Sequence, residues 1–92
     1  MFTLSAKLSF YIAEAGSLKD KRQIRRSLIE KTRNKFNAAV AEIDTQDSYK
    51  ELTIGIAVVS SDSRHRENSL DEIIRFMEKN TAVELTAAEI FE

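Results

Sequence analysis

The chain contains no cysteine and no proline, and Gly16 and Gly55 are its only glycines among 92 residues. The absence of cysteine excludes disulfides, thiolate chemistry and zinc sites built on cysteine. Without proline, and with so little glycine, no stretch has the composition of a flexible linker or a low-complexity segment. We therefore expect residues 1–92 to form a single domain.

Long hydrophobic runs are absent as well. Ser5, Lys7 and Ser9 interrupt the apolar residues near the N-terminus, so this segment does not resemble a signal peptide. No segment approaches the roughly eighteen unbroken apolar residues of a membrane span. Hydrophobic residues make up 42% of the chain and charged residues 32%, as in ordinary folded soluble domains. The sequence predicts a cytoplasmic protein that does not enter a membrane.

Positive charge is distributed very unevenly. Residues 17–36 hold eight of the fourteen Lys and Arg residues and only two acidic ones, a net charge of +6. The rest of the chain holds six basic and thirteen acidic residues, a net charge of −7. A dense positive surface is typical of proteins with an anionic partner. The basic segment is therefore the first candidate for a binding surface.

Apolar and polar residues alternate without a break from Phe2 to Ile12, which predicts a strand with one buried face. Similar alternation predicts a strand at residues 52–59. Weaker patterns predict strands at about residues 38–45 and from about residue 81 onward, the last with a bulge before Ile90.

Two segments have the period of a helix. Ser17 is expected to cap the first, which runs to about residues 34–36, with Asp20 in a near capping box. The second spans about residues 64–79. Lys21 and Arg25 fall within the apolar arc of the first helix. We expect their stems to lie along the edge of the core, with the charged groups in solvent.

The order β-α-β-β-α-β is the pattern of an α+β, ferredoxin-like sandwich. It predicts a four-stranded antiparallel sheet of order 4-1-3-2 with two helices on one face. From right-handed crossovers we further expect the first and third strands to be central and to run in the same direction. Both helices would then begin at the same edge of the sheet.

A shared edge would bring two helix N-termini together. Ser17 lies at one, and Ser61 and His65 lie at the other. Free N–H groups and the helix dipole attract anions to such positions. The sequence therefore predicts an anion-binding site formed by Ser17, Ser61 and His65. The alternative is that these side chains are solvated and point away from the helix axes.

The first helix carries a second candidate site. Lys19, Arg22, Arg26 and Arg33 are spaced by three, four and seven residues, so they share one side of the helix over about 20 Å. That length suits a run of phosphates. The alternative is a charged helix face with ion pairs to acidic residues of the second helix. The full set of candidate nucleic-acid-binding residues is Lys19, Lys21, Arg22, Arg25, Arg26, Arg33, Arg64 and Arg66.

Other chemistry is less well supported. Ser61, Asp62 and His65 lie within five residues of one another and cannot easily take the geometry of a catalytic triad. RNA-recognition motifs stack bases on exposed aromatic residues of a central strand, whereas residues 53–59 place only small or aliphatic residues on the open face. Such a face could instead pack against a second copy of the chain.

Five segments, taken in order along the chain, resemble the YlxP-like family. They are Gly16-Ser17-Leu18-Lys19-Asp20-Lys21-Arg22, Arg33-Asn34-Lys35-Phe36-Asn37, Ala41-Glu42-Ile43-Asp44 with Gln46-Asp47, Val58-Val59-Ser60-Ser61-Asp62, and Arg75-Phe76. The resemblance implies a small bacterial protein with a ferredoxin-like fold and no assigned activity. It also implies gene neighbourhoods that contain translation initiation and ribosome-maturation factors.

From the basic helix and this resemblance together, we expect a non-enzymatic, cytoplasmic protein that binds RNA or a ribosomal particle. No cofactor and no metal is expected. The alternative is a self-associating regulatory or protein-interaction module that uses the open sheet face, so that the chain is either a monomer or a homodimer.

Overall fold

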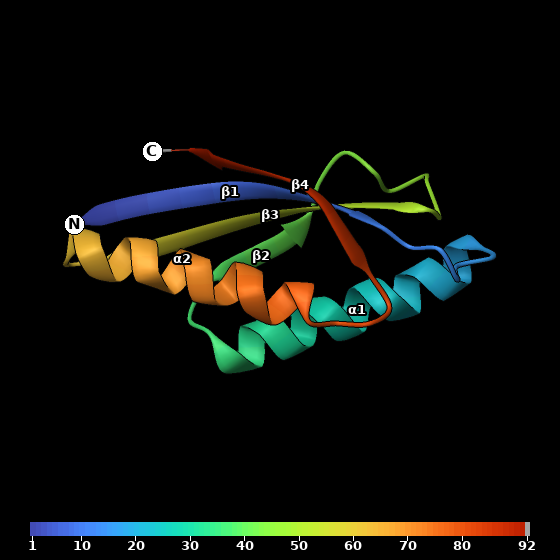
Figure 1. Cartoon of the computed structure of the whole chain (residues 1–92), viewed down its shortest axis with the longest axis horizontal. Coiled ribbons are helices and arrows are strands. Elements are labelled where there is room, and N and C mark those ends of the chain that lie inside the picture. Colours follow the sequence, from blue (N-terminus) through green and yellow to red (C-terminus); the bar gives the residue numbers. More distant parts are fainter. Residues whose placement is uncertain (92) are drawn as a thin grey trace.

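The secondary structure follows the order predicted from the sequence. The computed structural model describes the backbone of residues 1–91 and the side chains of residues 1–62 and 69–91. The four strands form one layer, and the two helices lie along one face of it (Figure 1). The elements are β1 (Phe2–Tyr11), α1 (Leu18–Lys35), β2 (Ala39–Glu42), β3 (Glu51–Ser60), α2 (Ser63–Glu78) and β4 (Glu84–Phe91).

The sheet has the order β2-β3-β1-β4, as predicted. The direction predicted for the central strands is wrong, because β1 pairs with β3 antiparallel. The crossover through α1 makes β1 and β2 parallel, and the turn after β2 reverses the chain, so β3 must oppose β1. Tyr11 lies opposite Glu51, and Phe2 opposite Ser60. Helices α1 and α2 therefore begin at opposite ends of the sheet (Figure 1).

The core lies between the sheet and the helices. Alternate residues of the two central strands face the helices and are almost fully buried. Helix α2 packs its apolar side on them, and α1 contributes fewer buried apolar residues than α2. The alternation predicted for both central strands is confirmed. The buried apolar residues described in these four elements are Leu4, Ala6, Leu8 and Phe10 on β1, Leu52, Ile54, Ile56 and Val58 on β3, Leu70, Ile73 and Met77 on α2, and Leu28 on α1.

Strand β4 carries the predicted bulge. Phe10 pairs with Leu85 and Ser9 with Ala87, so Thr86 is the extra residue. The bulge shifts the phase of the strand and places Ile90 opposite Ala6, on the helix side of the sheet. Because the side chains change faces at the bulge, apolar and polar residues alternate less clearly along β4 than along β1.

Local capping sets the start of α1. The Ser17 hydroxyl accepts a hydrogen bond from the Asp20 N–H at 3.1 Å, as an N-cap residue does. The Asp20 carboxylate accepts from the N–H of Gly16 at 3.0 Å, one residue before the position that a capping box would use. Thus the cap is confirmed, and the two bonds fix the angle at which the chain enters α1.

Candidate nucleic-acid interface

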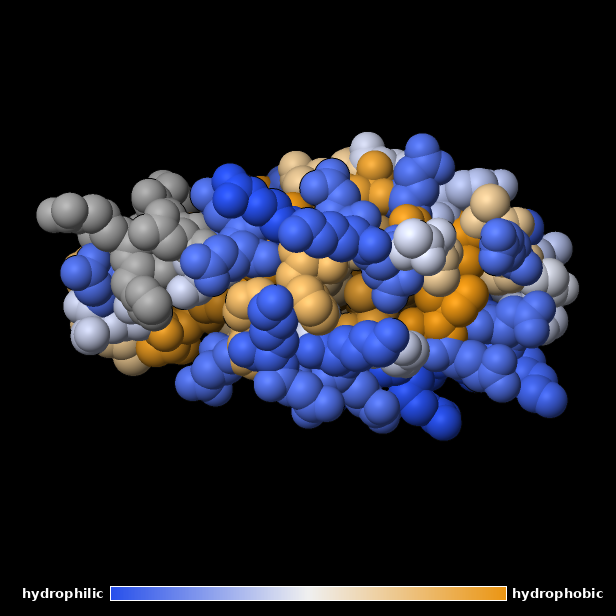
Figure 2. Space-filling view, turned by 60° about the horizontal axis from the view of Figure 1, so that its bottom comes forward, coloured by the Kyte–Doolittle hydropathy of each residue, from blue (hydrophilic) through white to orange (hydrophobic). Residues whose placement is uncertain are grey.

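Helix α1 presents part of its positive charge on the side that faces away from the sheet. The buried residues Leu28 and Thr32 set its inner side. Lys19, Arg22 and Arg26 lie on the outer side, are exposed, and form no ion pair with any described residue. We call these three residues the outer stripe. Figure 2 shows many hydrophilic side chains on the helix side of the molecule, with hydrophobic patches exposed among them. The alternative, in which this helix face pairs with acidic residues of α2, is not borne out for Asp71 and Glu72, which form no ion pair with the stripe, and the side chain of Glu67 lies outside the described residues.

Arg33, the fourth residue of the predicted row, has a structural contact. Its Nη2 donates a hydrogen bond to the carbonyl oxygen of Val40 on β2 at 2.6 Å. The residue is exposed, but its guanidinium is held against the sheet. We therefore leave Arg33 out of the outer stripe.

Lys21 and Arg25 lie on the apolar side of α1, as predicted, but their charged groups are not in solvent. The Lys21 side chain is 1% exposed, and its Nζ lies 2.7 Å from Oε2 of Glu42 on β2. Arg25 Nη1 donates to the other carboxylate oxygen, Oε1, at 2.9 Å. Lys21 therefore cannot reach an external phosphate, and the interpretation that its charged group lies in solvent is wrong. Arg25 is partly buried in the same cluster and is also removed from the candidate surface.

Each donor of the Lys21 ammonium has an acceptor. Besides Glu42, the ammonium donates to the backbone carbonyl oxygens of Thr45 and Ser48. An ammonium group has three donors, so this one is fully satisfied. The Thr45 hydroxyl donates to the Glu42 carboxylate at 3.0 Å and accepts from the Thr53 N–H at 2.8 Å. The segment after β2 thereby closes over the start of α1.

The same contacts set the ionisation of Glu42. Burial alone would raise the pKa of this carboxyl, but hydrogen bonds from Lys21, Arg25 and Thr45, together with the charge of Lys21, outweigh burial and hold the pKa below its ordinary value. Glu42 is therefore charged at neutral pH. Two of the segments that carry the family resemblance, the one with Lys21 and the one with Glu42, meet at this ion pair.

The predicted anion site at two adjacent helix N-termini is wrong. Ser17 precedes α1 at the end of the sheet where β1 finishes, and Ser61 follows β3 at the other end. The Ser17 hydroxyl is already used as the cap. The side chains of Arg64, His65 and Arg66 lie outside the described residues. Ser17 and Ser61 thus belong to opposite ends of a molecule that is 42 Å long.

A groove between α1 and α2 is a second basic surface, which the sequence reasoning missed. Its volume is about 700 Å³, and Lys31 and Lys35 of α1 line it opposite Phe76 of α2 and Lys79, the residue after that helix. Lys31 and Lys35 belong to the basic segment but lie on the flank of α1 opposite the outer stripe. The sequence did contain a hint of this groove. Two of the segments that resemble the family, Arg33–Asn37 and Arg75-Phe76, both contribute residues to its lining.

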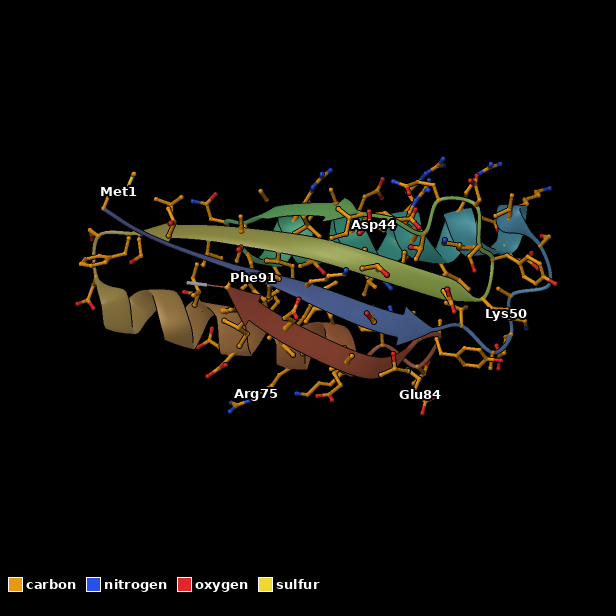
Figure 3. The ribbon with its side chains drawn as sticks, turned by 90° about the horizontal axis from the view of Figure 1, so that it is seen from above. Met1, Asp44, Lys50, Arg75, Glu84 and Phe91 are labelled. Atoms are coloured by element: carbon orange, nitrogen blue, oxygen red, sulfur yellow. The ribbon has the colours of Figure 1, made fainter. Side chains whose placement is uncertain are left out.

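The open face of the sheet is partly apolar. A hollow of about 560 Å³ lies over β2 and β3, where Ala41, Gly55 and Ala57 leave little side-chain bulk. Ile43 lies against Gly55, so a Cβ there would meet its methyl groups at 3.4 and 3.5 Å. Phe91 of β4 lines the same hollow and is labelled on this face in Figure 3. Bases could not stack on aromatic residues at the centre of this hollow.

The described residues thus form a small α+β domain, with an antiparallel four-stranded sheet and two helices on one face. In the described part of the chain, neither helix is both long enough and apolar enough to span a membrane.

The family described as "Protein of unknown function (DUF503)" matches residues 3–90, and the chain belongs to this family. It is 35% identical over 81 residues to "Uncharacterized protein YlxP" of Bacillus subtilis (strain 168), a match that covers 88% of each chain. The predicted resemblance to the YlxP-like family is therefore confirmed.

Proposed function

We propose that this protein is a non-catalytic, cytoplasmic bacterial module that binds RNA, or a ribosomal particle through its RNA, by the outer stripe of α1. One observation carries the proposal: Lys19, Arg22 and Arg26 are exposed on one side of a helix and have no ion-pair partner among the described residues. Cations left unpaired on an otherwise acidic domain attract phosphates and steer anionic polymers to that side.

The helix that carries the stripe is held rigidly. Lys21 and Arg25 project from its other side into the cluster around Glu42, and Ser17 caps its first turn. Rigid positioning reduces the entropy lost on binding, because the cations already have their spacing. From Lys19 to Arg26 the helix rises about 10 Å, enough to face more than one phosphate of a strand.

The fold is consistent with such a role. We assign the β-α-β-β-α-β order and the antiparallel sheet to the ferredoxin-like class. In this class many proteins bind RNA on the open sheet face, but here that face lacks central aromatic residues. The helix side is the more basic surface, so we place the contact there and expect it to recognise backbone charge rather than base sequence.

The test is RNA binding by a variant that lacks the stripe. We would measure the affinity of the purified chain for single-stranded and structured RNA by fluorescence anisotropy at several salt concentrations, and its co-sedimentation with ribosomes. Neutralising all three stripe residues to Gln should weaken RNA binding strongly and reduce its salt dependence, while circular dichroism shows an unchanged fold. The single variant Arg26→Gln should also weaken binding. Its matched control is Lys7→Gln, which removes one positive charge from the opposite face of the molecule. Equal RNA affinity of the stripe variant and the unmodified chain would refute the proposal.

Self-association through the open sheet face is a second candidate. It is favoured by the apolar hollow at Gly55 and by Val59, which is 66% exposed on the same face. Small residues allow a second sheet to approach closely. Light scattering after size exclusion tests this candidate, because Ala57→Arg should convert a dimer to a monomer. A monomer at high micromolar concentration would exclude it.

A further inference from the structure

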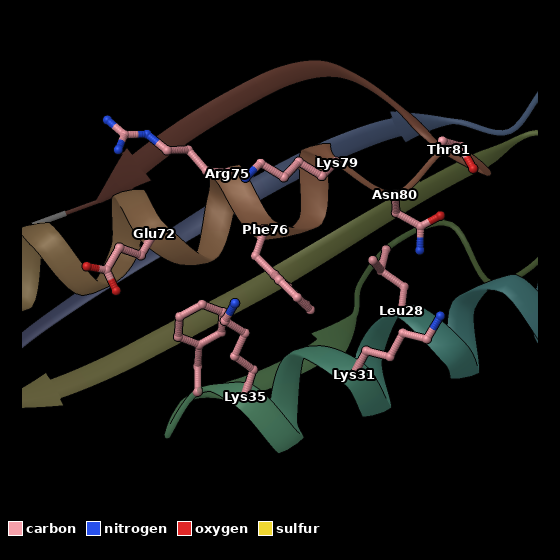
Figure 4. Close-up of a pocket in the computed structure, with 10 residues that line it drawn as sticks. Leu28, Lys31, Lys35, Glu72, Arg75, Phe76, Lys79, Asn80 and Thr81 are labelled. Carbon is pink, nitrogen blue, oxygen red and sulfur yellow. The ribbon is translucent and has the colours of Figure 1, made fainter.

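The groove between α1 and α2 differs from the outer stripe in position and in chemistry. Figure 4 shows Lys31 and Lys35 on α1 and Phe76 on α2 lining the groove from its two sides, with Lys35 by Phe76 and Asn80 beyond the end of α2. Its volume of about 700 Å³ lies within the range of about 300–1,000 Å³ that is typical of small-molecule sites. The groove is therefore large enough for a ligand of its own.

The charge of the groove is mostly positive and is not neutralised. Lys31, Lys35 and Lys79, which we call the groove lysines, line it together with Arg75, and Glu72 is the only acidic residue among the described residues of its lining. None of the groove lysines forms an ion pair with a carboxylate in the described part of the chain. Like charges gathered in one depression repel one another, so an anion that binds there relieves the repulsion.

One of these cations is held over aromatic rings. Phe36 and Phe76 meet edge to face with ring centroids 5.5 Å apart. The Lys35 ammonium lies 4.8 Å from the Phe76 centroid and 5.8 Å from that of Phe36, within the range of cation–π attraction. The rings attract the ammonium without cancelling its charge. They also supply an apolar wall against which a flat group could pack.

A neutral donor is fixed at the other end of the groove. The Asn80 Oδ1 atom accepts a hydrogen bond from the N–H of Ala82 at 2.9 Å. That bond sets which way the amide is turned, so its NH₂ group points away from Ala82. In Figure 4 the Asn80 nitrogen and the Lys31 side chain lie toward each other from opposite sides of the groove. The amide nitrogen donates to no described residue.

From these contacts we propose that the groove binds a nucleoside phosphate. The groove lysines and the Asn80 amide would contact the phosphates, and the Phe36–Phe76 wall would contact the base. The four cations and one acid of the lining leave a net charge of +3, which complements a di- or triphosphate. A free nucleotide and a nucleotide within an RNA strand share this chemistry. The site does not depend on the outer stripe, because the two surfaces lie on opposite flanks of α1.

The experiment is a titration of the ¹⁵N-labelled full chain, followed by NMR, with ATP, inorganic phosphate and a single-stranded hexaribonucleotide as separate ligands. ATP should shift the amide signals of Lys31, Phe76 and Asn80. Lys31→Gln combined with Lys79→Gln should raise the Kd for ATP by about tenfold or more, because each charge-assisted bond that is lost weakens binding. Both lysines are exposed, so the fold should be retained. Arg22→Gln with Arg26→Gln is the matched control and should leave the Kd for ATP within about twofold.

The ligands also separate the two sources of the nucleotide. Groove shifts with ATP but not with the hexaribonucleotide would support a free nucleotide, and shifts with both would support a nucleotide of an RNA chain. Binding of inorganic phosphate as tight as that of ATP would overturn the proposal, because the aromatic wall would then contribute nothing. Absence of groove shifts with ATP and with the hexaribonucleotide would overturn it as well, and would leave the outer-stripe proposal untouched.

Discussion

Lys21 of α1 and Glu42 of β2 form an ion pair of 2.7 Å in which the two side chains are only 1% and 5% exposed. This contact joins the first helix to the edge strand, across 21 positions of the chain. A buried charge is costly unless it is paired and its remaining hydrogen-bonding capacity is satisfied. Here both conditions are met, since the ammonium also donates to two backbone carbonyls and the carboxylate also accepts from Arg25 and Thr45.

Removing the ammonium should therefore destabilise the domain strongly. We expect Lys21→Met to lower the free energy of unfolding by about 3 kcal/mol, because the buried carboxylate loses its closest partner and two carbonyl oxygens lose their donor. Urea unfolding monitored by circular dichroism measures the change. Arg25→Met should cost about 1 kcal/mol, since the Arg25 side chain is 28% exposed and water can replace its bond.

The double variant Lys21→Met/Glu42→Leu shows how much of the destabilisation comes from breaking the ion pair and how much from losing each side chain. An apolar pair of similar volume often replaces a buried ion pair with little loss of stability. We expect the double variant to be more stable than Lys21→Met alone, with a clear coupling energy between the two sites. Simple additivity of the two single effects would show that the ion pair is not what holds α1 to β2.

The same carboxylate predicts a pH dependence. The pKa of Glu42 is below 4.5 in the folded chain and near 4.5 in the unfolded chain. A depressed pKa stabilises the fold fully above pH 4.5, and this contribution is lost as the pH falls through the folded-state value. The stability difference between the unmodified chain and Glu42→Gln should thus be largest near neutral pH and shrink below pH 4.5. Urea unfolding at several pH values tests this, and a difference that grows in acid would contradict it.

The Ser17 cap can be tested independently of any ligand. Ser17→Ala removes the acceptor for the Asp20 N–H and should lower the free energy of unfolding by about 1 kcal/mol. Ser17→Asp should retain most of the stability, because its carboxylate accepts the same bond and interacts favourably with the helix dipole. Thermal unfolding of the two variants side by side is sufficient. Equal losses in both would mean that the hydroxyl does not act as a cap.

The outer stripe predicts a change in salt dependence. Each phosphate contact to a single strand contributes about −0.7 to the slope of log K against log salt. If Lys19, Arg22 and Arg26 each contact one phosphate, neutralising all three should reduce the magnitude of the slope by about 2. The slope is obtained from anisotropy titrations across a range of salt concentrations. An unchanged slope with a weaker affinity would show that the three residues act on the fold and do not contact phosphate.

The elements of the fold could be predicted because their signals are local. Alternation from Phe2 to Ile12 and the cap at Ser17 can be read within a few residues, and both were right. The direction of β3 relative to β1 is not local, because it depends on how α1 crosses the sheet and on the turn before β3. The error in direction placed Ser61 beside Ser17, and the predicted anion site depended on it.

The site could be predicted only in part for a similar reason. The pattern placed Lys21 and Arg25 within the apolar arc of α1, which was correct, and it predicted a strand at about residues 38–45, which contains Glu42. It could not show that this helix side meets that strand, since the contact joins residues far apart in sequence. The groove was missed because its two flanks come from different helices. Only the exposed stripe on a single helix was accessible to reasoning along the chain.

The contact from Arg33 to Val40 has a consequence for how this sheet can meet other chains. Ile43, the residue after β2, donates to the carbonyl of Thr53 at 2.8 Å. In an antiparallel pair alternate residues bond to the partner strand, so Ala41 and Ala39 bond to β3 and the Val40 carbonyl faces the outer edge. The guanidinium of Arg33 donates a hydrogen bond to that carbonyl oxygen. With only four residues in β2 and one edge acceptor already taken, an incoming extended segment finds little to pair with there. Strand addition, whether by a partner or in aggregation, is thereby directed to the opposite border, along β4.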